Sequence, residues 1–234
     1  MDAIVDASVP AILVFFIIVA IGDFVVYKLR WALLFMVYIV GYGIILSYPP
    51  PIQQQWHLQF KWMGKVLAIV YSLVVMRLLR LTRNEVGFRW PSQRWGTTLA
   101  GILAIVVIGM VVNYMFRDGK WPTVETLLYQ ASMPGLDEEL AYRGIGFAML
   151  VRSFAARGGV WWATGLTAPL FGVGHALSFA NGNFHFSAVA FIYTGTTGLL
   201  LGVTRAKTGS LLGPFIAHNV ANVCSEMVSS LQPH

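Results

Sequence analysis

Residues 137–144 read DEELAYRG, and they open an apolar stretch that continues to residue 155. Three acidic residues in a row are followed, four positions after the last of them, by an arginine. The rest of the chain is poor in charge, since 57% of its 234 residues are hydrophobic and only 11% are charged. A soluble globular domain has about 25% charged residues. So few charges cannot cover a soluble surface, and we expect an integral membrane protein.

Apolar runs separated by short polar loops predict an all-α, polytopic helical bundle with about eight transmembrane helices. Each run is close to the roughly 20 residues that a helix needs to cross about 30 Å of hydrocarbon. The expected spans are residues 9–28, 31–48, 62–80, 96–115, 137–155, 159–179, 186–204 and 209–230. The segment 121–134 is too short to span, and we expect an interfacial helix there. The basic loop 77–94 separates an N-terminal part, residues 1–95, from residues 96–234, which hold the unusual polar residues.

The predicted loops alternate in charge, with eleven basic residues on one side and four on the other. The eleven are Lys28, Arg30, Arg77, Arg80, Arg83, Arg89, Arg94, Arg152, Arg157, Arg205 and Lys207, and the four are Lys61, Lys65, Arg117 and Lys120. Because basic loops stay in the cytoplasm, this pattern predicts that both termini face outside. It also attributes the net charge of +6 to cytoplasmic loops and not to nucleic-acid binding. A bacterial or archaeal plasma membrane is the expected location.

The acidic stretch is the first of three polar clusters inside the expected spans, where a charge costs about 2.5–3.5 kcal/mol on insertion scales. Glu139 and Arg143 are four residues apart, so on a helix they share a face and can pair. Glu138 is offset by about 100° and faces elsewhere. Taken alone, the acids could decorate a helix N-terminus, which the macrodipole favours. The buried arginine argues against that reading, because it needs a dedicated partner.

Two further clusters follow on separate spans. In FGVGH, residues 171–175, the phenylalanine and the histidine share a helix face, and the two glycines allow another helix to approach closely. In HNVAN, residues 218–222, the histidine and the last asparagine share a face. Each cluster alone could be interhelical hydrogen-bonding glue. Three such clusters on three spans favour a functional site.

The clusters resemble the CPBP family of glutamic-type intramembrane proteases, which includes the type II CAAX prenyl endopeptidases. That family carries the motifs EExxxR, FxxxH and HxxxN on separate membrane helices. Here they stand as Glu138-Glu139-x-x-x-Arg143, Phe171-x-x-x-His175 and His218-x-x-x-Asn222. The resemblance covers about residues 121–230. It implies an intramembrane endopeptidase that processes a peptide or protein substrate associated with the lipid bilayer.

The chemistry of these residues is consistent with the same activity. Peptide hydrolysis needs a base that activates water and donors that stabilise the developing oxyanion. Glu138 is the expected base, and His175 is expected to hold or share the same water. His218 and Asn222 are the expected oxyanion donors. The pair formed by Glu139 with its arginine would then orient the helix so that the base faces the cavity.

Two alternatives remain open at this point. A glutamate with two histidines also resembles a zinc site with an open position. However, there is no HExxH motif, and the three residues come from three helices. We therefore expect no metal and no other cofactor. A non-catalytic protein, either a transporter or a bacteriocin-immunity or scaffold protein that retains the pocket, is the alternative function, because intramembrane carboxylates and histidines also form proton relays. Transporters more often show repeated halves, and we see none here.

The predicted topology also bears on the substrate. The helix directions place Glu138, His175 and Asn222 at mid-membrane or in its outer half. This location favours exported or membrane-anchored peptides over a prenylated protein that is presented from the cytosol.

Overall fold

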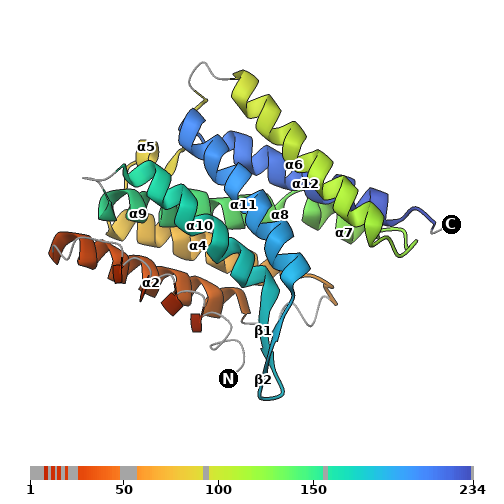
Figure 1. The fold of residues 1–234 in the computed structure, drawn as a ribbon, viewed down its shortest axis with the longest axis horizontal. Helices are drawn as coiled ribbons and strands as arrows, with labels where there is room; N and C mark the ends of the chain where they lie inside the picture. The colour runs from red at the N-terminus through yellow and green to blue at the C-terminus, as the bar shows by residue number, and fades with distance from the viewer. Residues whose placement is uncertain are drawn as a thin grey trace.

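The computed structural model describes residues 26–47, 57–91, 95–154 and 158–232, together with isolated positions between residues 8 and 20. The chain is mostly helical (Figure 1), as predicted. The helices are α2 (Val26–Ser47), α4 (Trp62–Leu78), α5 (Arg83–Val86), α6 (Trp95–Met115), α7 (Val124–Gln130), α8 (Met133–Glu139), the π-helix η1 (Leu140–Gly146), α9 (Phe147–Ser153), α10 (Gly159–Ala176), α11 (Ala188–Thr208) and α12 (Leu212–Ser229). The strands are β1 (Leu177–Ala180) and β2 (Asn183–Phe186).

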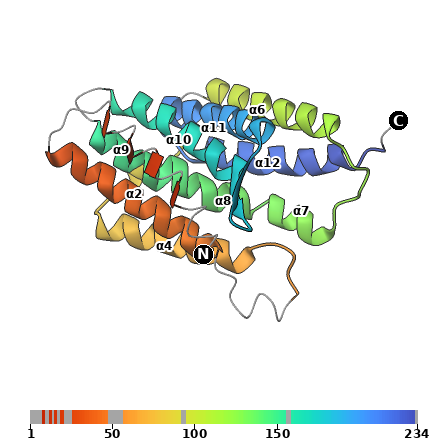
Figure 2. The ribbon, with the colours of Figure 1, turned by 60° about the horizontal axis from the view of Figure 1, so that its bottom comes forward.

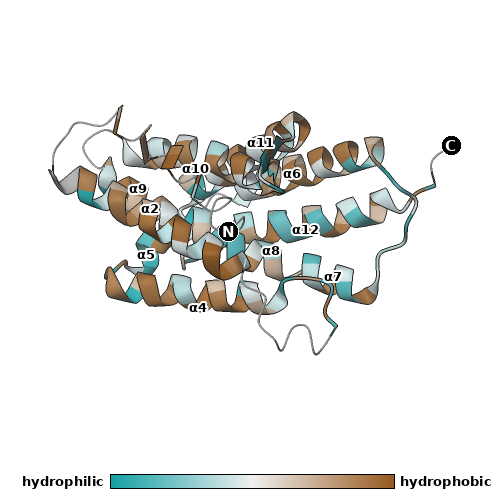
Figure 3. Ribbon diagram, turned by 90° about the horizontal axis from the view of Figure 1, so that it is seen from below, coloured by the Kyte–Doolittle hydropathy of each residue, from teal (hydrophilic) through white to brown (hydrophobic). Residues whose placement is uncertain are grey.

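Most of the expected spans correspond to these helices. The expected span at 9–28 lies largely outside the described residues. By length and composition, two described stretches, Leu29–Ser47 and Trp95–Met115, are long and apolar enough to cross a membrane. Helix α6 directs Leu99 and Leu103 outward with 62% and 64% of their surface exposed, and Figure 3 shows hydrophobic residues over much of α2, α4 and α6. An exposed apolar surface of this kind is typical of a membrane-facing helix. The total of eight spans stays a prediction.

The predicted helix boundary was wrong between residues 177 and 186. We expected the sixth span to run to residue 179, but α10 ends at Ala176 and the chain forms the antiparallel β1–β2 hairpin, which projects from the bundle in Figure 1 and lies in front of it in Figure 2. Asn181 and Gly182 form the turn with φ values of 52° and 78°. Positive φ at both positions defines the two-residue turn that Asn-Gly favours. That dipeptide is the sequence signal that identifies the hairpin.

The N-terminal helices pack directly on the helices that follow. Phe35 and Tyr38 of α2 belong to the same buried hydrophobic cluster as Met149 and Leu150 of α9. All four side chains are at most 1% exposed. The described residues before position 95 therefore form part of one packed bundle, while the division into two domains at that position stays a prediction.

Basic residues from separate loops lie at one end of the bundle. Arg152, in the last turn of α9, donates from Nε to Glu85 Oε1 at 2.7 Å and from Nη2 to the carbonyl oxygen of Arg80 at 3.2 Å. Arg205, in the last turn of α11, donates to the carbonyl oxygen of Glu85 at 2.6 Å. The loops predicted to share one membrane side thus contact each other, although Arg94 and Arg157 lie outside the described residues.

Lys65, which was counted with the basic residues of the opposite side, does not extend into a loop. It lies inside α4 and is 4% exposed. By the same measure Arg205, which is 5% exposed inside α11, leaves the basic side, so ten basic residues oppose three and the orientation stays a prediction.

Helices α10 and α11 cross at a point of close backbone contact. A Cβ atom added at Gly172 would lie 3.1 Å from the Cα atom of Gly195 and 3.1 Å from the carbonyl oxygen of Phe191. Both neighbours are backbone atoms, so the helices would have to separate. Since α10 carries His175 one turn further along, this contact also sets the position of a candidate site residue.

Replacing Gly172 with alanine should destabilise the protein by about 1–3 kcal/mol, which is the usual cost of overpacking. The matched control is Gly165→Ala in the same helix, because a Cβ there meets nothing within 4 Å. That change should be neutral or stabilising, since alanine favours a helix interior by up to about 1 kcal/mol over glycine. Thermal unfolding of both purified variants in detergent measures the difference. Equal unfolding temperatures would contradict the close packing.

Candidate active site

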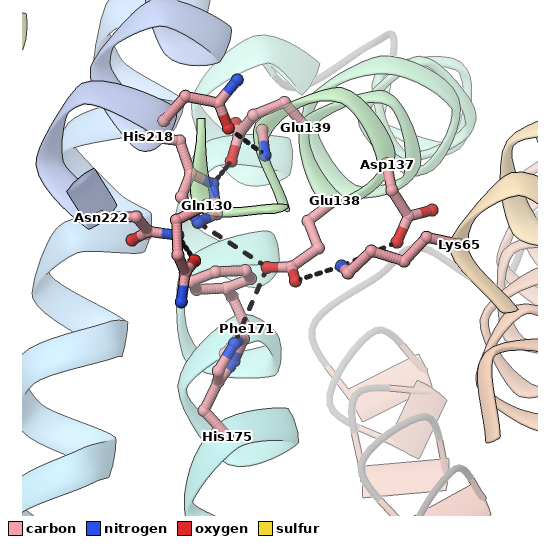
Figure 4. A network of polar contacts seen from close by, with 12 residues as sticks. Lys65, Gln130, Asp137, Glu138, Glu139, Phe171, His175, His218 and Asn222 are labelled. Atoms are coloured by element: carbon pink, nitrogen blue, oxygen red, sulfur yellow. Dashed lines mark hydrogen bonds and ion pairs between the residues drawn. The ribbon is translucent and has the colours of Figure 1, made fainter. Parts of the chain in front are cut away.

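The acidic cluster lies where α8 continues into the π-helix η1. Helix α8 ends at Glu139, and all seven residues of η1 are buried. A π-turn adds a residue to the helical repeat and occurs frequently at functional sites. Glu138 and Glu139 point in different directions from this junction (Figure 4). The sequence predicted the divergence of the two carboxylates but not the change in helix type.

Glu138 lies between a lysine and two histidines in a cavity of about 280 Å³ (Figure 4). Its Oε1 atom is 2.7 Å from Lys65 Nζ. Its Oε2 atom is 3.7 Å from His175 Nε2 and 3.8 Å from His218 Nε2. The side chain of Glu138 is 13% exposed. The structure therefore brings together, around one carboxylate, two histidines that are 43 residues apart in the chain (218 − 175).

The partners of the two imidazole rings determine which nitrogen faces the cavity as an acceptor. His175 Nδ1 is 2.9 Å from the carbonyl oxygen of Phe171, which can only accept, so Nδ1 carries the proton. His218 Nδ1 is 2.8 Å from Glu139 Oε1 and donates for the same reason. In the neutral rings both Nε2 atoms are therefore acceptors. They converge on Glu138 Oε2, which is itself an acceptor.

Glu139 makes the ion pair that its spacing from the arginine predicts. Arg143 Nη1 is 3.0 Å from Glu139 Oε1, and both side chains are at most 1% exposed. Arg143 also donates from Nη2 to the carbonyl oxygen of Gly198 at 3.0 Å and lies over the ring of Phe171 at 4.5 Å from its centroid. The pair thus connects η1 to α10 and α11. Through His218 Nδ1 it also connects to α12.

Lys65, Asp137 and Tyr42 are site residues that the sequence analysis missed. Lys65 Nζ is 3.1 Å from Asp137 Oδ2 as well as 2.7 Å from Glu138. The Tyr42 hydroxyl donates to the same Asp137 oxygen at 2.8 Å. A lysine near the end of an apolar run usually extends toward the membrane surface, so the sequence contained no local signal for an inward orientation.

Asn222 lines the same cavity, but its hydrogen bond connects it to α7. Its Nδ2 atom donates to Gln130 Oε1 at 3.0 Å, and Gln130 donates in turn to Glu226 Oε1 at 3.0 Å. An amide nitrogen carries two hydrogens, so Asn222 retains one for another acceptor. Asn219, which was not singled out from the sequence, accepts from the backbone N–H of Gly135 at 2.8 Å and holds α12 against α8.

The buried charges predict a large effect of changing Lys65. Lys65→Met would leave Asp137 and Glu138 buried without their shared cation, and losing one partner of a buried pair costs about 3–5 kcal/mol. The expected result is a much lower unfolding temperature or loss of expression. Lys61→Met is the matched control, because Lys61 is exposed at the N-cap of the same helix, four residues earlier.

Adding Asp137→Asn to Lys65→Met should recover part of the lost stability, because the double variant buries one fewer unpaired carboxylate. Expression and thermal unfolding in detergent test both steps. The assignment fails if Lys65→Met behaves like Lys61→Met.

Comparison with known proteins agrees with the motifs. No curated protein and no solved structure matches the chain. Residues 119–224 match the family model described as type II CAAX prenyl endopeptidase Rce1-like. This segment begins just before α7 and ends within α12, so it contains all three motifs, whereas Lys65 and Tyr42 lie outside it. Residues 119–224 are thus similar to the Rce1-like type II CAAX prenyl endopeptidases, which the sequence motifs also resemble.

Proposed function

We propose that the protein is a glutamic-type intramembrane endopeptidase in which Glu138 activates a water molecule. One observation carries the proposal. Glu138 Oε2 faces two histidine Nε2 atoms at 3.7 and 3.8 Å, which is too far for direct hydrogen bonds. A single water molecule bridges polar groups at such separations. The match of residues 119–224 to the Rce1-like family model supports hydrolysis of a peptide bond.

The acceptor character of the three atoms orients that water. A water molecule between them can donate one hydrogen to Glu138 Oε2 and the other to His175 Nε2, which leaves an oxygen lone pair for a substrate carbonyl carbon. As the oxygen attacks, Glu138 takes a proton from the water, and it then delivers this proton to the leaving nitrogen when the C–N bond breaks. His175 holds the water during attack.

Lys65 and Asn222 complete the proposed mechanism. The ammonium group of Lys65 contacts the Oε1 atom of Glu138, so it stabilises the carboxylate form and directs the other oxygen toward the histidines. The remaining N–H of Asn222 can donate to the oxyanion of the substrate. His218 can also donate to the oxyanion, but only after its Nε2 atom gains a proton, because its Nδ1–H group already donates a hydrogen bond to Glu139. The expected absence of a metal cofactor stays a prediction.

The proposed membrane arrangement has about eight spans with both termini outside. The basic end formed around Glu85, Arg152 and Arg205 would face the cytoplasm. Helix α8 begins at the opposite end, and Glu138 is five residues after its start, about 7–8 Å along the axis. The cavity then lies in the outer half of the membrane. This location supports a substrate that is exported or membrane-anchored.

Glu138→Gln tests the proposed function. The amide cannot accept the proton, so the rate of peptide hydrolysis should fall by several orders of magnitude while folding and insertion are retained. Comparative proteomics of membrane and secreted peptides from wild-type and variant cells identifies substrates, and the purified proteins are then assayed on them. Near-wild-type cleavage by the variant would exclude Glu138 as the base. An identical peptide profile in both cells would favour the non-catalytic alternative.

Cysteine labelling tests the orientation, in a chain in which Cys224 is first replaced by serine. A cysteine introduced by Ser92→Cys, in the basic loop, should be shielded from an impermeant maleimide in intact cells. A cysteine introduced by Asn183→Cys, in the exposed hairpin, should react. The reverse pattern would place the cavity on the cytoplasmic side and favour a prenylated substrate.

A further inference from the structure

A second polar cavity lies at the basic end of the bundle and shares no lining residue with the Glu138 cavity. Its volume is about 270 Å³, and its lining includes Glu85, Arg89, Phe147 and Arg205. We propose that this cavity binds a phosphate-type oxyanion between the guanidinium groups of Arg89 and Arg205. The inference does not depend on the proposed peptidase activity.

Arg205 is a buried cation whose described hydrogen bonds reach only backbone carbonyl groups. It is 5% exposed. Its Nε atom donates to the carbonyl oxygen of Arg143 at 3.0 Å, and its Nη2 atom donates to that of Glu85 at 2.6 Å. Arginine is seldom fully buried unless it is paired with an anion. A guanidinium group has five N–H donors, so three remain for a ligand in the cavity.

Arg89 supplies the second cation. Its side chain is exposed, and within the part of the chain that the structure describes its guanidinium group has no ion pair or hydrogen bond. Two glycines leave room for the pair of guanidinium groups. A Cβ atom at Gly87 would lie 2.8 Å from Arg205 Cζ, and a Cβ atom at Gly209 would lie 2.7 Å from Arg89 Cζ. Both glycines have positive φ, 95° and 69°, so a side chain at either position would also strain the backbone.

The acidic residue that lines the cavity cannot neutralise these cations. Glu85 Oε1 accepts from Arg152 Nε at 2.7 Å. Its Oε2 atom accepts from Arg152 Nη2 at 2.9 Å and from the backbone N–H of Thr82 at 2.8 Å. Burial alone would raise the pKa of Glu85, but the hydrogen bonds from Arg152 and Thr82 outweigh it and lower the pKa to about 2. Arg152 therefore pairs with this carboxylate, and the positive charges of Arg89 and Arg205 remain for a bound anion.

A phosphate group matches this arrangement in charge and geometry. Planar guanidinium groups bind phosphate oxygens through paired, charge-assisted hydrogen bonds. Basic pockets between helices on the cytoplasmic side of membrane proteins bind lipid head groups. The anion could be the phosphate of an acidic phospholipid or a free phosphate in solution, and the experiment below separates these two sources.

The test uses the purified full chain in nanodiscs of phosphatidylcholine, measured by thermal unfolding. In one arm, phosphatidylglycerol is added to the bilayer; in the other, inorganic phosphate is added against chloride at matched ionic strength. Arg89→Gln removes one proposed ligand. Arg83→Gln is the matched control. Arg83, the first residue of α5, is exposed like Arg89 but does not line the cavity.

We expect the anion to raise the unfolding temperature of the wild type and of Arg83→Gln equally. Arg89→Gln should need about tenfold more anion for the same shift, since losing one charged hydrogen-bonding group costs about 1.4 kcal/mol or more. A response to phosphatidylglycerol alone identifies a lipid head group, and a response to inorganic phosphate identifies a soluble anion. Equal responses of both variants, or no response of the wild type in either arm, would overturn the proposal.

Discussion

The contact between Lys65 and the acidic stretch is the interaction on which the rest of the arrangement depends. Asp137, Glu138 and Glu139 are consecutive; the structure buries the first and the third, and leaves the second only 13% exposed. Such a concentration of negative charge in a low-dielectric interior is costly unless cations reach it. Lys65 reaches the first two from α4, and Arg143 reaches the third from η1. The positions of α4 and η1 are therefore constrained by charge as well as by apolar packing.

The same charges link most of the bundle to the site. Glu139 contacts His218 of α12, and Arg143 contacts Gly198 of α11. The close approach of α10 and α11 at Gly172 carries His175 to the same cavity. A change in one of these contacts should therefore alter both stability and site geometry. For this reason each activity measurement needs a parallel measurement of unfolding.

The two polar cavities divide the bundle into ends with different chemistry. The Glu138 cavity contains acceptor atoms that suit a water molecule, and the cavity at Arg89 and Arg205 contains donors that suit an anion. Arg205 bonds to the carbonyl oxygen of Arg143, so the two regions share the π-helix η1 as a structural connection. The N-terminal helices, which lie outside the family-matched segment, contribute Lys65 to the first region.

The sequence by itself determined the helical class, the approximate helix ranges and the pairing of Glu139 with Arg143, because hydrophobic runs and four-residue spacings are local properties. It also contained the Asn-Gly signal for the hairpin. Only the tertiary structure decided that Lys65 points inward, that His218 joins His175 beside Glu138, and that Asn222 bonds to Gln130. These contacts join residues that are far apart in the chain, up to 92 positions for Asn222 and Gln130, so no spacing rule relates them. Their geometry depends on how separate helices pack. The neighbouring carboxylates Asp137 and Glu138 need a cation in the interior, and Lys65 can supply it only when α4 packs against α8.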